Sequence, residues 1–182
     1  LNTSPQGMSI DENNGLISWI PNNNSVGDTL VMIMVTDDSA ATDTQSYALQ
    51  IENVNDPPIV SSPMADLIAD EDGPHLSYAL YDIFHDDDIL SVNDTLSFVV
   101  LNGNEDLLAA TISDDSLHLS SHGDQYGVAE LILTAHDIDL TAVSDTVKIT
   151  INPINDAPSI TSNDSAEAIE DVRFLYQADA ID

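Results

Sequence analysis

The sequence lacks cysteine and is nearly without positive charge. Lys148 and Arg173 are its two basic residues, against 33 Asp plus Glu, which gives a formal net charge of −31. Without cysteine there is no disulfide framework and no thiolate chemistry. Such a negative field repels nucleic acid and anionic lipid headgroups, so neither is expected as a partner. The same field attracts cations.

Long apolar runs are missing as well. No run approaches the ~20 apolar residues that cross a bilayer as a helix. Hydrophobic residues nevertheless make up 42% of the chain and fall in patterned runs, which excludes a disordered acidic tail. No signal peptide is visible and the chain starts at Leu1 rather than Met, so we expect a piece of a longer protein.

A repeat of one hundred residues organises the chain. The stretch "ENVNDPPIV" (52–60) returns as "NPINDAPSI" (152–160), and "LVMIMVTD" (30–37) aligns with "ELILTAHD" (130–137). From Gly27 onward this alignment has no gap. The chain therefore contains related units rather than one large domain.

Alternation of apolar and polar residues within the repeat indicates β-strands. Tyr47, Leu49 and Ile51 alternate with polar or small residues, and Val147, Ile149 and Ile151 do so in the second copy. Turn signals separate such runs every ten residues or so, and no segment has a helical period. The expected fold class is all-β, built as antiparallel β-sandwiches.

The repeat also predicts the domain boundaries. Residues 58–157 form a complete unit, 1–57 supply the later strands of a preceding unit, and 158–182 supply the opening strands of a following unit. We call residues 52–58 the first joint and residues 152–158 the second joint. Because a half-sandwich exposes its inner face, we expect the natural molecule to continue in both directions.

Proline and oxygen-bearing side chains meet at the first joint. Pro57 and Pro58 fix the backbone and hold the preceding residue extended, which makes the joint stiff. Several carboxylates brought together repel one another, whereas calcium takes about six to eight oxygens from carboxylates, amides and carbonyls. A turn in which Asn and Asp bond their own backbone is the simpler alternative, and it needs no metal.

These features resemble a known family. The strand that ends in "NVNDPP", the following "ED" and the later D-x-D are similar to cadherin-type repeats, more closely to bacterial cadherin-like repeats with "VNDAP" linkers. The segment "GMSIDENNGLISWIP" (7–21) resembles dystroglycan-type cadherin-like modules. The resemblance implies tandem Ig-like or cadherin-like sandwiches with calcium between them.

The resemblance also implies metal ligands at both joints. At the first joint they are Asn55, Asp56, Glu71, Asp86, Asp88 and Asp137, and at the second Asn155, Asp156, Glu170 and Asp182. The pattern departs from a full cadherin linker, because Asn53 and Pro57 replace the first and last members of D-x-N-D-N and the L-D-R-E segment is absent. One or two ions for each joint are therefore expected rather than three.

The leading functional hypothesis is a structural segment of a large extracellular or cell-surface protein, such as an adhesin stalk or surface fibre. Its partners would be Ca²⁺ and neighbouring repeats, with surface glycans or a second copy as further candidates. Two alternatives are a carbohydrate- or partner-binding module of a secreted protein and a fibre subunit assembled by strand exchange. The sequence carries no phosphate loop, nucleophile elbow or helical metalloprotease motif, so we expect no enzyme.

Overall fold

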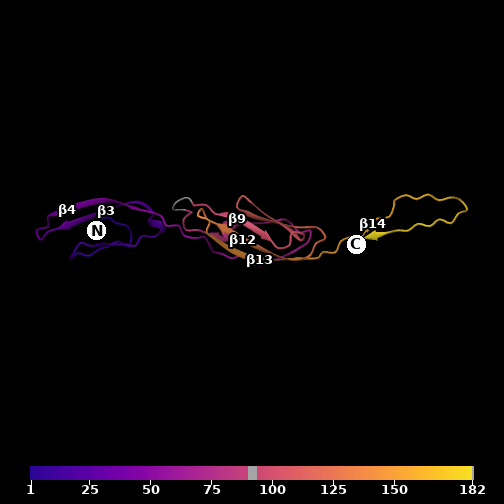
Figure 1. The fold of residues 1–182 in the computed structure, drawn as a ribbon, viewed down its shortest axis with the longest axis horizontal. Coiled ribbons are helices and arrows are strands. Elements are labelled where there is room, and N and C mark those ends of the chain that lie inside the picture. The colour runs from indigo at the N-terminus through magenta and orange to yellow at the C-terminus, as the bar shows by residue number, and fades with distance from the viewer. Residues whose placement is uncertain (90–93, 182) are drawn as a thin grey trace.

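The computed structural model describes residues 1–89 and 94–181. These residues form strands joined by turns, with two 3-10 turns at Asn23–Ser25 (η1) and Leu80–Asp82 (η2). The all-β prediction is confirmed. Figure 1 shows an N-terminal segment (residues 1–51), a middle sandwich (59–152) and a C-terminal segment (159–181) following one another along the long axis.

Two sheets make the middle sandwich. The four-stranded sheet has the order β6 (Leu67–Asp70), β13 (Ala142–Asn152), β12 (Gly127–His136), β9 (Ser97–Asn102). The three-stranded sheet has the order β10 (Leu108–Ser113), β11 (Ser116–Ser121), β7 (Leu76–Ala79). All neighbours are antiparallel except β6, which runs parallel to β13. A short pair, β5 (Ile59–Val60) with β8 (Phe84–His85), lies beside the linker.

The core lies between these two sheets. Val147, Ile149 and Ile151 are buried, as their alternation predicts, and Leu131 and Ala129 of β12, opposite Val147 and Ile149, join them in the core. Phe84 is also completely buried, which anchors β8 to the core. Apolar burial of this kind is the main stabilising contribution to a sandwich.

The N-terminal segment repeats part of this architecture. It contains β1 (Ser9–Ile10), β2 (Ile17–Ser18), β3 (Gly27–Thr36) and β4 (Thr42–Ile51). Strands β3 and β4 pair in the same register as β12 and β13, one hundred residues later. The turns also match, since Ala40 and Leu140 have φ of 64° and 65°. Tyr47, Leu49 and Ile51 are half-buried here.

The C-terminal segment repeats the opening of the middle sandwich. Strand β14 (Ser159–Ile160) pairs antiparallel with β15 (Ala180–Ile181), as β5 pairs with β8. Both pairs continue with the same two backbone hydrogen bonds, in which consecutive N–H groups donate to one carbonyl. Within the described part of the chain, no helix is long and apolar enough to cross a membrane.

Substitution of Leu131 tests where the core lies. Leu131 is completely buried, so Leu131→Ala should lower the free energy of unfolding by about 2–5 kcal/mol through lost burial and a cavity. Leu101 on the adjacent strand is 62% exposed, and Leu101→Ala should change it by less than about 0.5 kcal/mol. Urea denaturation measures both values. Equal effects would contradict this assignment of the core.

Candidate metal centre

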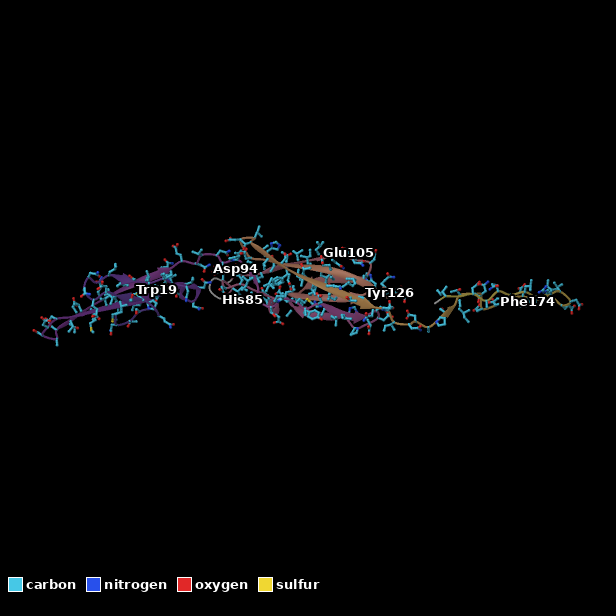
Figure 2. All side chains as sticks on the ribbon, turned by 90° about the horizontal axis from the view of Figure 1, so that it is seen from below. Trp19, His85, Asp94, Glu105, Tyr126 and Phe174 are labelled. Carbon is cyan, nitrogen blue, oxygen red and sulfur yellow. The ribbon has the colours of Figure 1, made fainter. Side chains whose placement is uncertain are left out.

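Three buried carboxylates converge at the end of the middle sandwich that faces the N-terminal segment. Asp86, Asp94 and Asp137 each offer an oxygen atom, and these atoms all lie within 4.8 Å of one another. The three residues are 1%, 4% and 2% exposed. Figure 2 shows Asp94 and His85 at this end and Tyr126 at the opposite end.

The strand topology explains this convergence. Strand β9 starts opposite the end of β12, because Ser97 pairs with His136. Asp94, shortly before β9, and Asp137, directly after β12, therefore occupy the same edge. Asp86 follows β8, whose Phe84 is fixed in the core. Each carboxylate is thus placed by a strand end.

Backbone groups hold one oxygen of each carboxylate. The Asp88 N–H donates to Asp86 Oδ1 at 2.8 Å, and the Ile138 N–H donates to Asp94 Oδ1 at 3.2 Å. Asp137 Oδ1 accepts the Thr141 N–H at 2.7 Å, and its Oδ2 accepts the Thr141 hydroxyl. The carboxylates are therefore oriented by the fold before any ligand binds.

The remaining oxygens include atoms without a partner. Asp86 Oδ2 and Asp94 Oδ2 are buried and accept no hydrogen bond in the structure, and the same is true of Asn53 Oδ1 in the linker. Leaving a buried acceptor unpaired costs about 1–3 kcal/mol, and more for a charged group. Native proteins seldom carry such groups without an ion, a water or a functional role.

The charge state of the site follows from its surroundings. Burial raises the pKa of Asp86, and repulsion from Asp94, Asp88 and Asp137 adds to this, although the Asp88 N–H opposes it. Burial alone would also raise the pKa of Asp137, but hydrogen bonds from Asn55 and Thr141 outweigh it and lower that pKa. Asp137 therefore stays ionised beside carboxylates that repel it.

No side-chain cation compensates this charge among the described residues. The ion pair that the described chain contains joins His85 Nε2 to Asp87 Oδ1 at 3.0 Å, and both side chains are more than half exposed. Asp87 therefore points away from the cluster, whereas its neighbours Asp86 and Asp88 are buried. In the sequence Asp86-Asp87-Asp88, the first and third side chains therefore point into the protein and the middle one points to solvent.

The first joint is bound into the same site. Asn55 Nδ2 donates to Asp137 Oδ2 at 3.0 Å, and the Asp56 N–H donates to Asp88 Oδ2 at 2.7 Å. From the other side, Asn23 Nδ2 donates to Asp56 Oδ2 at 2.7 Å. The linker thus connects the N-terminal segment to the carboxylate cluster.

The structure places Glu71 elsewhere, which corrects its assignment to the first joint. Strand β6 runs parallel to β13, so both strands end at the second joint, where Asp70 pairs with Asn152. Glu71 Oε1 there accepts the Ile154 N–H at 2.7 Å. Glu71 is 4% exposed, and its Oε2 is buried without a partner.

Two acidic residues beside the joints were not predicted as ligands. Asp94 has no counterpart within the sequence, since position 194 lies beyond residue 182, so the repeat could not single it out. Asp124 lies in a turn, and the missing L-D-R-E motif gave no reason to select it. Asp124 could have been found from its position, because it comes just before β12, and the start of β12 pairs with the end of β13 beside the second joint.

The second joint forms a more open acidic group. A hollow of about 850 Å³ is lined by Glu71, Asp124, Asn155 and Asp156, with Tyr126 at its edge. Desolvation raises the pKa of Asp156, as do charge repulsion and a hydrogen bond from Asp124, followed by repulsion from Asp72 and Glu71.

Of the other two predicted ligands of the second joint, only Glu170 is among the residues that the structure describes. Glu170 is exposed on the turn of the C-terminal segment and does not line the hollow. Asp182 lies outside the described residues.

Comparisons with known proteins agree with the fold. Residues 1–52 match a family model described as "Putative Ig domain". The search of curated proteins returned no match. Extracellular cadherin domains 1–4 of protocadherin gamma B7 are similar in structure, with a TM-score of 0.50, 16% identity and 91% of this chain covered. The chain spans 44% of that protein's structure.

Two further solved structures are more distant. The human desmocollin-1 ectodomain has a TM-score of 0.39 and 14% identity, covering 85% of this chain and 32% of its own. An endo-fucoidan hydrolase of glycoside hydrolase family 107 has a TM-score of 0.40 and 19% identity, covering 81% and 26%. These scores carry no functional argument. The family model and the protocadherin support an Ig-like or cadherin-like fold.

The buried charge predicts an unusual stability change in the absence of divalent metal. In chelator, Asp94→Asn should raise the free energy of unfolding by about 1–3 kcal/mol. The amide oxygen still accepts the Ile138 N–H, and one buried negative charge is removed from beside Asp86 and Asp137.

Thermal unfolding in chelator measures this effect. The matched control is Asp87→Asn in the same acidic cluster of the sequence, where an exposed side chain predicts a change within about 0.5 kcal/mol. A lower melting temperature for Asp94→Asn than for the parent chain in chelator would contradict the account.

Proposed function

We propose that this chain is a structural segment of an extracellular or cell-surface protein whose tandem sandwiches are held in line by calcium. Its units are residues 1–57, 58–157 and 158–182. The observation that carries the proposal is the pair of buried, unpartnered oxygens on Asp86 and Asp94, in a carboxylate cluster to which the linker is hydrogen-bonded. A bound cation supplies the partner that these oxygens lack.

The donor set favours calcium among common cations. Asp86, Asp94 and Asp137 supply carboxylate oxygens that lie close together. Calcium accepts about six to eight such oxygens in flexible geometry, whereas magnesium keeps several waters that a buried site excludes. Zinc and other transition metals favour nitrogen or sulfur donors, and His85 is exposed and paired with Asp87.

Binding at this place would act on the joint itself. A cation among the carboxylates cancels their mutual repulsion and strengthens the cluster that Asn55 and Asp56 contact. With Pro57 and Pro58 fixing the following backbone, the joint then holds one orientation. The segment would thereby act as a rod in calcium-rich surroundings and bend more readily without calcium.

The resemblance to cadherin-like repeats supports an extracellular or cell-surface location for this function. The "VNDPP" linker and the dystroglycan-type stretch at 7–21 resemble bacterial cadherin-like repeats, and the fold is Ig-like or cadherin-like. Extracellular calcium modules bind with dissociation constants of about 10⁻⁴–10⁻³ M. An extracellular or cell-surface location would supply calcium in that range.

Among the aromatic side chains that a carbohydrate-binding module could use, Trp19 has a structural role. Trp19 is half-buried, and its Nε1–H donates to the Gln6 carbonyl at 3.1 Å. Its counterpart one hundred residues later, Leu119, is a core residue of the middle sandwich. A tryptophan at a core position does not favour a sugar-binding platform.

Calcium-dependent unfolding tests the proposal. Calcium at one hundred times its dissociation constant should stabilise the chain by about 2.7 kcal/mol and raise its melting temperature by ~10 °C. Asp94→Asn should lose most of this calcium-dependent shift, although it is the more stable protein in chelator. Asp87→Asn should keep the full shift. Equal shifts in the parent chain and Asp94→Asn would contradict a metal at this site.

A further inference from the structure

Strand β9 forms an open edge of the middle sandwich. Figure 1 shows β9 beside β12, and the four-stranded sheet ends at β9 on this side and at β6 on the other. Within the described part of the chain, no strand pairs with the outer side of β9. An edge strand of this kind leaves backbone N–H and C=O groups available to another strand.

The four edge strands of the sandwich differ in how well they are protected from such pairing. Strands β6 and β7 have four residues each, and β6 ends in Asp70 and Glu71 while β7 follows Pro74. Short length, charge and proline are features by which natural proteins protect sheet edges. Strands β9 and β10 have six residues each, with neither charge nor proline. Only small or polar side chains of β10 are exposed, whereas β9 exposes Val99 and Leu101, at 55% and 62%.

The hydrogen-bond pattern determines which backbone groups of β9 face the open edge. Directly beyond β9, the Gly103 N–H donates to the Glu130 carbonyl of β12 at 2.9 Å. Residues bonded to a given neighbour alternate along an antiparallel strand. The odd-numbered residues of β9 therefore bond to β12, whereas the N–H and C=O groups of Phe98 and Val100 point to the open edge.

The charge distribution indicates which strand can pair here. The chain carries a net charge of −31, so two copies repel each other over most of their surface. The residues of β12 opposite Val99 and Leu101 are Thr134 and Ile132, so this strip is uncharged across both strands. A positively charged partner would be attracted to the acidic surface instead. A strand that fits the strip is uncharged, apolar and free at its own edge, and β9 of a second copy has all three properties.

We propose that β9 pairs antiparallel with β9 of a second copy, so that the two four-stranded sheets join into one continuous sheet. A twofold axis at Val100 sets Val99 of each copy opposite Leu101 of the other. The residues that face the open edge then form hydrogen-bonded pairs, and the exposed apolar side chains cover each other. Each copy contributes the same surface, as in other twofold dimers. This contact would join two segments side by side, and it uses neither joint and needs no metal.

Analytical ultracentrifugation in chelator tests the association. At millimolar protein the parent chain should form dimers. Their dissociation constant should fall as salt rises, because the Debye length shortens from about 10 Å at 0.1 M to about 3 Å at 1 M and screens the repulsion between copies. A chain that stays monomeric at every salt concentration would overturn the inference, and so would dimers that dissociate as salt is added.

Charged substitutions test the register. The double variant Val99→Lys with Leu101→Lys should weaken association at least ~tenfold, because like charges then face each other. It also lowers the net negative charge, so stronger overall repulsion between copies cannot be the cause. The corresponding double glutamate variant should be equally weak, and a mixture of the two should form heterodimers. Unchanged association of the lysine variant, or a mixture that stays monomeric, would contradict pairing at β9.

The matched control is a substitution at the opposite edge of the same sheet. Ile68 on β6 is 76% exposed, and Ile68→Lys should leave the dissociation constant unchanged. All variants should keep the melting temperature of the monomeric parent chain within about 2 °C, because the substituted side chains are exposed. If Ile68→Lys abolishes the dimer, the contact lies on another surface and the proposed pairing is wrong.

Amide hydrogen exchange measured by NMR reports the pairing at single residues. As protein concentration rises, exchange of the Phe98 and Val100 amide protons should slow. The amide protons of Val99 and Leu101 already bond to β12 and should not change. Slowing confined to the N-terminal or C-terminal segment would place the contact there and overturn the inference.

Discussion

Electrostatic repulsion among Asp86, Asp94 and Asp137 is the constraint on which the arrangement of the first joint depends. The core of the middle sandwich fixes the strand ends that carry these carboxylates, so they cannot move apart without disturbing buried residues such as Phe84. Backbone N–H groups donate to one oxygen of each carboxylate, and Asp86 Oδ2 and Asp94 Oδ2 are left buried without a partner. Holding these like charges close together lowers the free energy of unfolding, and natural proteins accept such a loss chiefly at functional sites.

This constraint also links the cluster to the shape of the whole chain. The carboxylates stand at the end of one sandwich, and the side chain of Asn55 and the backbone of Asp56 reach into them from the linker. Any ligand that relieves the repulsion therefore acts where two units meet. The segments follow one another along one axis, as Figure 1 shows, and in the proposed function a ligand bound at the cluster would stiffen this arrangement.

Much of this structure could be predicted from the sequence, because the same strand and linker patterns occur in two copies of the repeat. Alternation identified the buried face of β13, and the fixed period of one hundred residues located the hairpins and joints. It could not place Glu71, because its position depends on the parallel pairing of β6 with β13, a long-range contact that alternation does not encode. Asp94 and Asp124 were missed for a related reason, since each lies in a loop that only the folded sandwich brings to a joint.

A crystal structure grown with calcium, with the anomalous signal measured at the first joint, tests the central claim most directly. The account predicts an anomalous peak among Asp86, Asp94 and Asp137, with oxygen ligands at about 2.3–2.6 Å. It also predicts that Asp86 Oδ2 and Asp94 Oδ2, which have no hydrogen-bond partner, are among those ligands. A site that holds only water, or carboxyl groups bonded to each other through shared protons, would contradict it.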